Sequence, residues 1–159
     1  MIRDRQYDDD GALEAVFDSR HADDEMELLA APNVGGEYLQ KCVEHFENLS
    51  NELLDALCEA LCRYCEDIRD DAEDVFGDLG LPETITGREI LNYCCPSCLS
   101  VEAPPSEDII GYSVEGNCDW EPEHGIQVII GDRLLFVSSF EGRSVWDSEE
   151  SYRDEWNYA

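Results

Sequence analysis

Basic residues are scarce in this sequence of 159 residues, which contains ten Lys and Arg in total and a single lysine, Lys41. It contains 39 Asp and Glu, so the formal net charge is −29 at pH 7. Proteins that bind nucleic acid phosphates or anionic lipid headgroups normally do so with clustered Lys and Arg. We therefore expect no binding to nucleic acid and none to a membrane surface. A basic protein partner, a cation and simple solubility remain as reasons for the acidity.

Long apolar runs are missing as well. No stretch of about 18 apolar residues is present to span a bilayer, and the first ten residues, MIRDRQYDDD, lack the apolar core of a secretory signal. The sequence therefore predicts a cytoplasmic protein. Its eight cysteines are too few for a disulfide scaffold and should stay reduced in that compartment.

Glycine and proline are absent from residues 37–76, where apolar side chains recur at helical spacing. The polar residues 48–51 favour helix caps over helix interiors, which predicts two consecutive helices with a break there. Thr86, followed three residues later by Glu89, has the pattern of a capping box that opens a short helix towards Tyr93.

The carboxyl half of the sequence has the alternation expected of strands. Residues 110–120 alternate apolar and polar side chains, and residues 126–130 and 133–139 predict two further strands. Gly131 and Asp132 would join the last two as a two-residue hairpin, which gives an antiparallel meander. Trp120 falls on the apolar face of the first strand and is predicted to be buried.

These patterns predict one α+β domain over residues 1–159, in which a long helical segment packs on an antiparallel β-sheet. Residues 35–93 are mainly helical and residues 99–139 mainly strand. Residues 1–34 are the least legible part: residues 12–17 and 26–31 read as short strands, which would extend the sheet, or as helix fragments. Residues 146–159 form an aromatic closing segment, with a helix expected over residues 148–156 and with aromatic side chains that could cover one sheet face, namely Trp146, Tyr152, Trp156 and Tyr158.

Two cysteine pairs, Cys62-x-x-Cys65 and Cys95-x-x-Cys98, have the spacing of two halves of a four-thiolate zinc site. The first pair lies in a predicted helix, where Cys58, Cys62 and Cys65 share one face, as small packing residues also would. The second pair resembles a thiol redox motif, but it follows a short helix instead of preceding one. We expect buried thiols and no cofactor, with zinc and redox chemistry as alternatives.

Four potential ligands gather between two predicted strands, namely Asp119, Glu121, Glu123 and His124. Asp119, Glu123 and His124 could hold a cation or include a general base. No nucleophile elbow, phosphate-binding glycine loop or HExxH helix is present to complete an active site. We therefore favour a structural role in which His124 and Gly125 close the turn, with the imidazole bonded to backbone or to a carboxylate.

The same segment, CDWEPEHGIQVIIGDRLLFVSSFEG, resembles the carboxyl-terminal module of an uncharacterised bacterial domain family. That family is recognised by a W-x-x-E-H-G turn between strands, and its positions here are Trp120, Glu123, His124 and Gly125. The resemblance implies a bacterial, intracellular α+β domain, and it assigns no catalytic residue.

The sequence favours a non-catalytic protein whose carboxylate surface binds a basic protein partner. Small acidic bacterial proteins often accompany toxins as immunity proteins, so we expect an immunity-like or regulatory protein that neutralises its target. One such target is a nuclease, which the carboxylate surface would block by imitating the phosphates of its substrate. The alternative is a small metal-binding protein or metal-dependent enzyme that uses Asp119, Glu123 and His124 or the two cysteine pairs.

Overall fold

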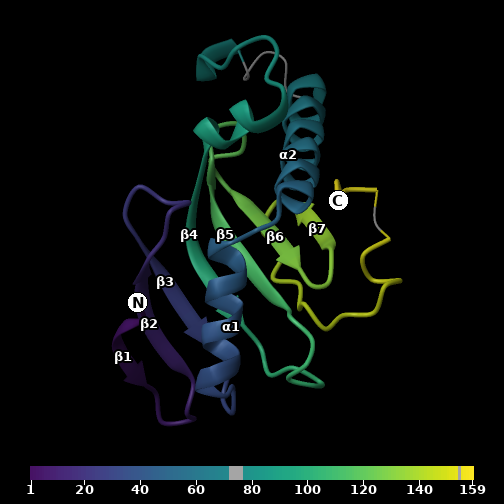
Figure 1. The fold of residues 1–159 in the computed structure, drawn as a ribbon. Coiled ribbons are helices and arrows are strands. Elements are labelled where there is room, and N and C mark those ends of the chain that lie inside the picture. Colours follow the sequence, from purple (N-terminus) through teal and green to yellow (C-terminus); the bar gives the residue numbers. More distant parts are fainter. Residues whose placement is uncertain (72–76, 154) are drawn as a thin grey trace.

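Seven strands form one continuous sheet in the computed structural model, which describes residues 1–71, 77–153 and 155–159 (Figure 1). The strands are β1 (Arg3–Tyr7), β2 (Leu13–Asp18), β3 (Glu25–Ala30), β4 (Cys94–Val101), β5 (Tyr112–Cys118), β6 (Ile126–Ile130) and β7 (Leu134–Ser138). They lie in the sheet in sequence order, and every neighbouring pair except β3 and β4 is antiparallel. The predicted α+β fold, with its carboxyl-terminal meander, is confirmed.

The two helices explain how β3 and β4 can lie parallel to each other. A parallel connection needs a crossover of about a dozen residues or more, because the chain must return to the end of the sheet from which it started. Here α1 (Gly36–Glu47) and α2 (Asn51–Asp71) belong to that crossover. Both lie on the same face of the sheet, with α1 against β4 and α2 against β7 (Figure 1).

The predicted break between the two helices is confirmed, and polar side chains stabilise it. The Asn48 side chain donates a hydrogen bond to Glu44 O at 2.8 Å, which satisfies a carbonyl at the end of α1. Ser50 Oγ accepts a hydrogen bond from the backbone N–H of Leu53 at 3.1 Å, which caps the start of α2. Asparagine and serine form such local bonds more readily than they continue a helix.

Two short 3₁₀ helices lie between α2 and β4, namely η1 (Gly77–Leu79) and η2 (Gly87–Tyr93). The second is the short helix predicted from the sequence. The capping box itself is wrong, because the described Thr86 side chain caps no backbone N–H of this helix.

The amino-terminal residues form strands, not helix fragments. In β2 and β3, buried and exposed residues largely alternate, which places one face of each strand on the core. The sequence analysis missed β1, and all five of its residues are exposed. This edge strand pairs with β2 through its backbone and buries no apolar face of its own.

The strand boundaries in the carboxyl half differ from the prediction. β4 begins at Cys94, five residues before the expected start, and β5 ends at Cys118, short of Trp120. The predicted two-residue hairpin is wrong: Ile130 pairs with Leu134 after a register shift, and Gly131 N donates to Arg133 O at 2.9 Å. Residues 131–133 therefore form a three-residue connection, because a bulge changes the alignment of β6 and β7.

The closing segment also differs from the prediction, since none of its described residues in the range 148–156 is helical. Instead, the segment bonds to the edge of the sheet. Asn157 Nδ2 donates to Leu135 O at 2.9 Å, while the backbone N–H of Val137 donates to Asn157 Oδ1 at 3.1 Å. The backbone N–H of Tyr158 donates to Val137 O at 3.0 Å, so the outer edge of β7 is covered.

The alternation within β6 divides the core into two parts. Ile126, Val128 and Ile130 pack with the helices in the main core, whereas Ile129 points to the opposite face. There it packs in a second cluster that contains Phe136, Val145 and Tyr152, with Trp146 against it, so part of the aromatic closing segment covers the sheet as predicted. Trp156 is 49% exposed and takes no part. Across the described ranges, every helix is too short or too polar to cross a membrane.

Candidate protein-binding face

The turn between β5 and β6 carries the W-x-x-E-H-G residues, and Glu121 organises it. One carboxylate oxygen, Glu121 Oε1, accepts the backbone N–H groups of Glu123 and His124, both at 3.2 Å. The backbone N–H of Gly125 donates to Glu121 O at 2.9 Å. Gly125 has a φ of +64°, and a Cβ atom there would overlap the carbonyl oxygen of Gly116. Glycine is therefore required at the end of this turn.

Trp120 and His124 point to different surroundings. Trp120 is 2% exposed, which confirms its predicted burial, and its ring meets that of Tyr64 edge to face at a centroid distance of 5.8 Å. The side chain of His124 is 62% exposed, and its Nδ1 lies 3.3 Å from Glu121 Oε1. Tyr64 on α2 also donates to Gly125 O at 3.4 Å, so the turn is docked on α2 through Trp120 and Gly125.

The predicted ligands do not assemble into a metal site in the part of the chain that the structure describes. Neither Asp119, Glu123 and His124 nor any other described group of three or more His, Cys, Asp and Glu residues is arranged to hold a metal ion. The carboxylate that His124 contacts is that of Glu121, which the backbone of the turn already occupies.

The cysteine pairs are distributed over separate elements. Cys62 and Cys65 lie on α2, whereas Cys95 and Cys98 lie in β4. The extended segment was expected to begin at residue 99, after the CPSC sequence; this is wrong, because the CPSC sequence is itself part of the strand. Cys65 and Cys98 are buried, and burial raises the pKa of each thiol to about 11. Both therefore stay protonated at neutral pH, the form that neither attacks a disulfide nor binds a metal.

The outward faces of α1 and α2 together carry eight exposed carboxylates. We call these side chains the acidic helical face, which consists of Glu37, Glu44, Glu52, Asp55, Glu59, Glu66, Asp70 and Asp71. Among the residues that the structure describes, only Asp55 of this set forms an ion pair, with Arg88 at 2.6 Å. The remaining seven carboxylates are exposed to solvent.

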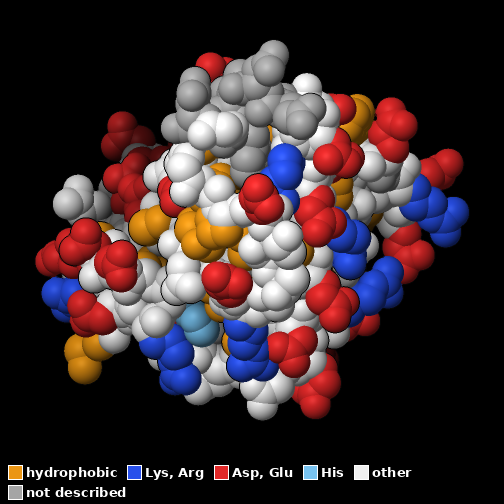
Figure 2. Space-filling model, turned by 90° about the horizontal axis from the view of Figure 1, so that it is seen from above, with side chains coloured by type: hydrophobic (Ala, Val, Ile, Leu, Met, Phe, Trp, Pro, Cys, Tyr) orange, Lys and Arg blue, Asp and Glu red, His pale blue; other side chains and the backbone are white. Residues whose placement is uncertain are grey.

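Three basic side chains on the same helices, Lys41, Arg63 and Arg69, bond backbone carbonyls. Lys41 donates to Glu107 O at 3.0 Å, and Arg63 Nε donates to Tyr158 O at 3.1 Å. Arg69 donates to Pro82 O at 2.9 Å. Each of these cations thus bonds a backbone carbonyl outside the two helices. Figure 2 shows one side of the molecule, on which Asp and Glu side chains outnumber Lys and Arg.

Sequence reasoning did not single out this face, although a signal for it exists. Glu52, Asp55, Glu59 and Glu66 follow one another at intervals of three, four and seven residues, which places them on one side of a helix. The sequence analysis used this spacing only for apolar residues. Applied to carboxylates, it would have identified the acidic helical face.

Comparisons with curated proteins and with solved structures gave no match to this chain. Residues 12–145 match a protein family, and that range contains six of the seven strands, both helices and the Trp120 to Gly125 turn. Because the match extends over far more than half of the chain, this protein belongs to the family described as Domain of unknown function (DUF6985).

Proposed function

We propose that this protein is a non-catalytic domain of the bacterial cytoplasm that binds a basic protein through the acidic helical face. By covering the cationic surface of its partner, it neutralises that partner as an immunity or regulatory protein does. The observation that carries this proposal is the charge of the face: eight exposed carboxylates on two consecutive helices, with one ion pair among the described residues. Carboxylates without counter-ions keep their potential for a partner.

The spacing of these charges supports a partner that normally binds phosphates. Carboxylates three or four residues apart on a helix are about 5 Å apart along its axis, at 1.5 Å per residue. Phosphates recur about every 3.4 Å along one strand of duplex DNA, which is the same order of distance. A nuclease, whose substrate site carries Lys and Arg, is therefore a suitable target.

Affinity capture from the native host at low and at high salt, followed by kinetics with the purified partner, tests the proposal. A face variant, E52Q/E59Q/E66Q, removes three charges without changing side-chain size. A matched control, D9N/D10N/E14Q, removes the same charge near the turn between β1 and β2, at the opposite end of the molecule from α2 (Figure 1). These six side chains are all exposed.

We expect a basic partner whose association rate falls as salt rises. At low salt the face variant should associate about tenfold more slowly, since steering by charge raises association rates by roughly 10-fold to 1,000-fold. The control should change the rate by less than about threefold, because its charges lie farther from the contact. A neutral or acidic partner with a salt-independent association rate would refute the proposal. Equal losses in both variants would show that total charge acts, and not this face.

A further inference from the structure

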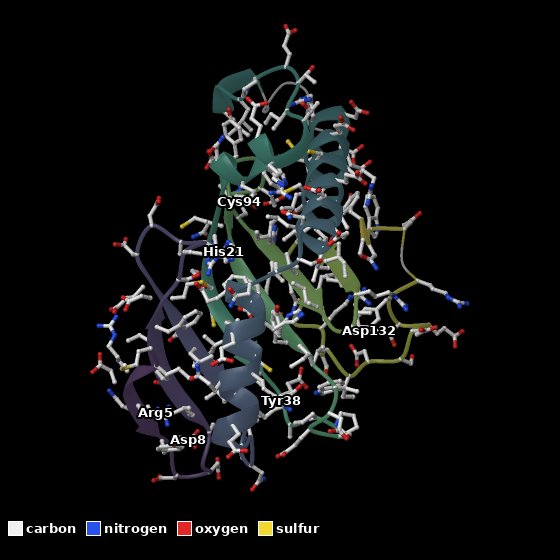
Figure 3. All side chains as sticks on the ribbon, in the orientation of Figure 1. Arg5, Asp8, His21, Tyr38, Cys94 and Asp132 are labelled. Carbon is white, nitrogen blue, oxygen red and sulfur yellow. The ribbon has the colours of Figure 1, made fainter. Side chains whose placement is uncertain are left out.

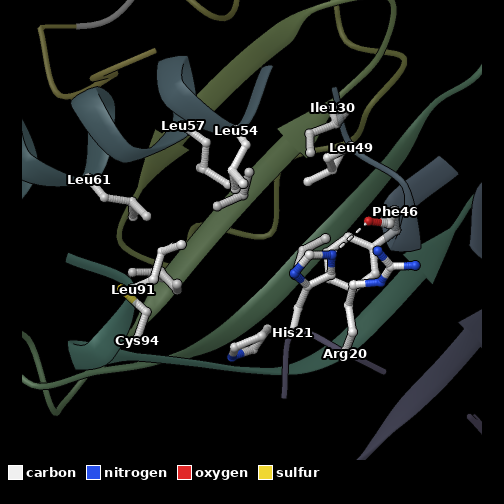
Figure 4. Close-up of a pocket in the computed structure, with 14 residues that line it drawn as sticks. Arg20, His21, Phe46, Leu49, Leu54, Leu57, Leu61, Leu91, Cys94 and Ile130 are labelled. Atoms are coloured by element: carbon white, nitrogen blue, oxygen red, sulfur yellow. Dashed lines mark hydrogen bonds between the residues drawn. The ribbon is translucent and has the colours of Figure 1, made fainter. Parts of the chain in front are cut away.

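An apolar cavity of about 230 Å³ lies between the helices and the sheet (Figure 4). Its walls come from both layers and include Leu54, Leu57, Leu61, Leu91, Val128 and Ile130. The cavity opens to solvent on one side, because several wall residues, among them Leu54 and Leu91, are only half-buried. Water finds few polar partners along these apolar walls, so an apolar ligand can displace it at little cost.

Arg20 and His21 lie at one end of the cavity, beside Phe46 (Figure 4). The His21 ring packs on the Phe46 ring at a centroid distance of 5.0 Å, and His21 Nε2 lies 3.1 Å from Phe46 O. Because a carbonyl oxygen only accepts, Nε2 carries the hydrogen of this bond. In the neutral ring, Nδ1 is then an acceptor that can take a hydrogen bond from a hydroxyl group.

The charges at this end are already balanced. Arg20 Nε lies 3.6 Å from Glu47 Oε2, and Arg20 Nη2 donates to Asn48 Oδ1 at 3.2 Å. Among the described residues that line the cavity, Arg20 is the only one with a permanent charge, so a cationic ligand meets no carboxylate in the walls. An anionic ligand meets an arginine that is already paired, in a protein of net charge −29.

We propose that this cavity binds a small uncharged molecule with an aliphatic or aromatic body and a single hydroxyl group at the Arg20 and His21 end. A cavity of about 150 Å³ with Leu, Ile and Phe walls binds benzene. In proportion, about 230 Å³ accommodates a molecule of about nine non-hydrogen atoms, hydroxyl oxygen included. Octan-1-ol has this size and this polarity.

Cys94 is a wall residue, but the binding is non-covalent. Figure 3 shows Cys94 at the start of β4, next to η2 and on the same side of the molecule as His21. The Cys94 thiol donates to Ile90 O at 3.5 Å, and burial raises its pKa far above the ordinary value for cysteine. A protonated, hydrogen-bonded thiol is a poor nucleophile, so it contributes only to the wall.

The ligand site is independent of the acidic helical face, even though α2 contributes to both. Leu54, Leu57 and Leu61 point from α2 towards the sheet, whereas Glu52, Asp55 and Glu59 point to solvent. Loss of ligand binding and loss of partner binding can therefore be separated by substitutions on opposite sides of the same helix.

Methyl NMR titration of the intact protein with octan-1-ol, octanoate and octylammonium tests the proposal. We expect intermolecular NOEs from the octan-1-ol chain to the methyl groups of Leu54, Val128 and Ile130. The two charged probes should bind at least about tenfold more weakly, because neither charge gains a partner that offsets its loss of water. This measurement needs no substitution and so does not depend on the folding of any variant.

L54F fills the cavity with a larger side chain and should weaken octan-1-ol binding at least about tenfold. The matched control is L53F: Leu53 is the adjacent half-buried leucine of α2 and lies outside the cavity wall. It should change the affinity less than about twofold. Three results would each overturn the proposal: no NOE to wall methyl groups, equal effects of the two variants, or tighter binding of octanoate than of octan-1-ol.

Discussion

Replacement of Trp120 should separate its packing from its polar group. The indole is 2% exposed and meets Tyr64 edge to face, so W120A should lower the free energy of unfolding by about 3 to 5 kcal/mol. A buried tryptophan contributes roughly 150 to 250 Å² of contact, which at about 25 cal/mol per Å² corresponds to about 4 to 6 kcal/mol before the site relaxes. The value from substitutions lies slightly below the value from buried area, because the site partly collapses into the cavity that W120A leaves.

The indole N–H makes W120F the more informative variant. Trp120 Nε1 is buried without a hydrogen-bond partner among the described residues, and an unsatisfied buried donor costs about 1 to 3 kcal/mol. Phenylalanine removes that donor and keeps one ring against Tyr64, so the gain offsets much of the lost volume. We expect W120F to destabilise the protein by about 1 kcal/mol or less, far below the cost of W120A.

Urea unfolding followed by far-ultraviolet circular dichroism measures both variants, with m-values checked for two-state behaviour. W156A is the control, because Trp156 is 49% exposed and its loss should cost about 1 kcal/mol or less. If W120F were as unstable as W120A, the unsatisfied N–H would have no energetic role. If W120A were as stable as the native chain, Trp120 would not belong to the core.

The helices and the meander were predictable because their signals are local. Apolar spacing and the polar residues 48–51 determine α1, α2 and the break between them, and alternation determines β5, β6 and β7. β1 gave no such signal, since its five residues are all exposed and it is held by backbone pairing with β2 and by ion pairs of Arg3 with Asp18 and Glu25. The parallel pairing of β3 with β4 depends on a crossover, which no short window of sequence contains.

The closing segment shows where a local signal misleads. A helix was expected over residues 148–156, but Asn157 and Tyr158 bond to β7 instead. A peptide of this length is a marginal helix, so a few bonds to an open strand edge are enough to favour the extended path. The cavity was equally out of reach, because residues as distant in sequence as Arg20 and Ile130 form its walls.

Two further predictions concern titratable groups. The only fully exposed cysteine among the eight is Cys95, whereas burial raises the pKa of Cys58 and Cys65 to about 11. A thiol reagent should therefore react rapidly with one thiol in the native protein and with all eight in urea. C95S should abolish the rapid phase; a rapid phase that survives in C95S would show that a half-buried thiol, Cys62 or Cys94, reacts instead and would refute the assignment to Cys95. Burial lowers the pKa of His45, whose Nδ1 lies 2.8 Å from the Tyr112 hydroxyl. The unfolded chain then binds a proton more readily than the folded one, so this histidine favours unfolding as the pH falls below its unfolded pKa of about 6.5. H45Q can still accept the tyrosine hydrogen bond but cannot titrate, so its urea midpoint should fall less than that of the native protein between pH 7 and pH 5. If the urea midpoints of H45Q and of the native protein fell in parallel over that range, His45 would have the same protonation state in the folded and unfolded chains. That result would refute the lowered pKa of His45.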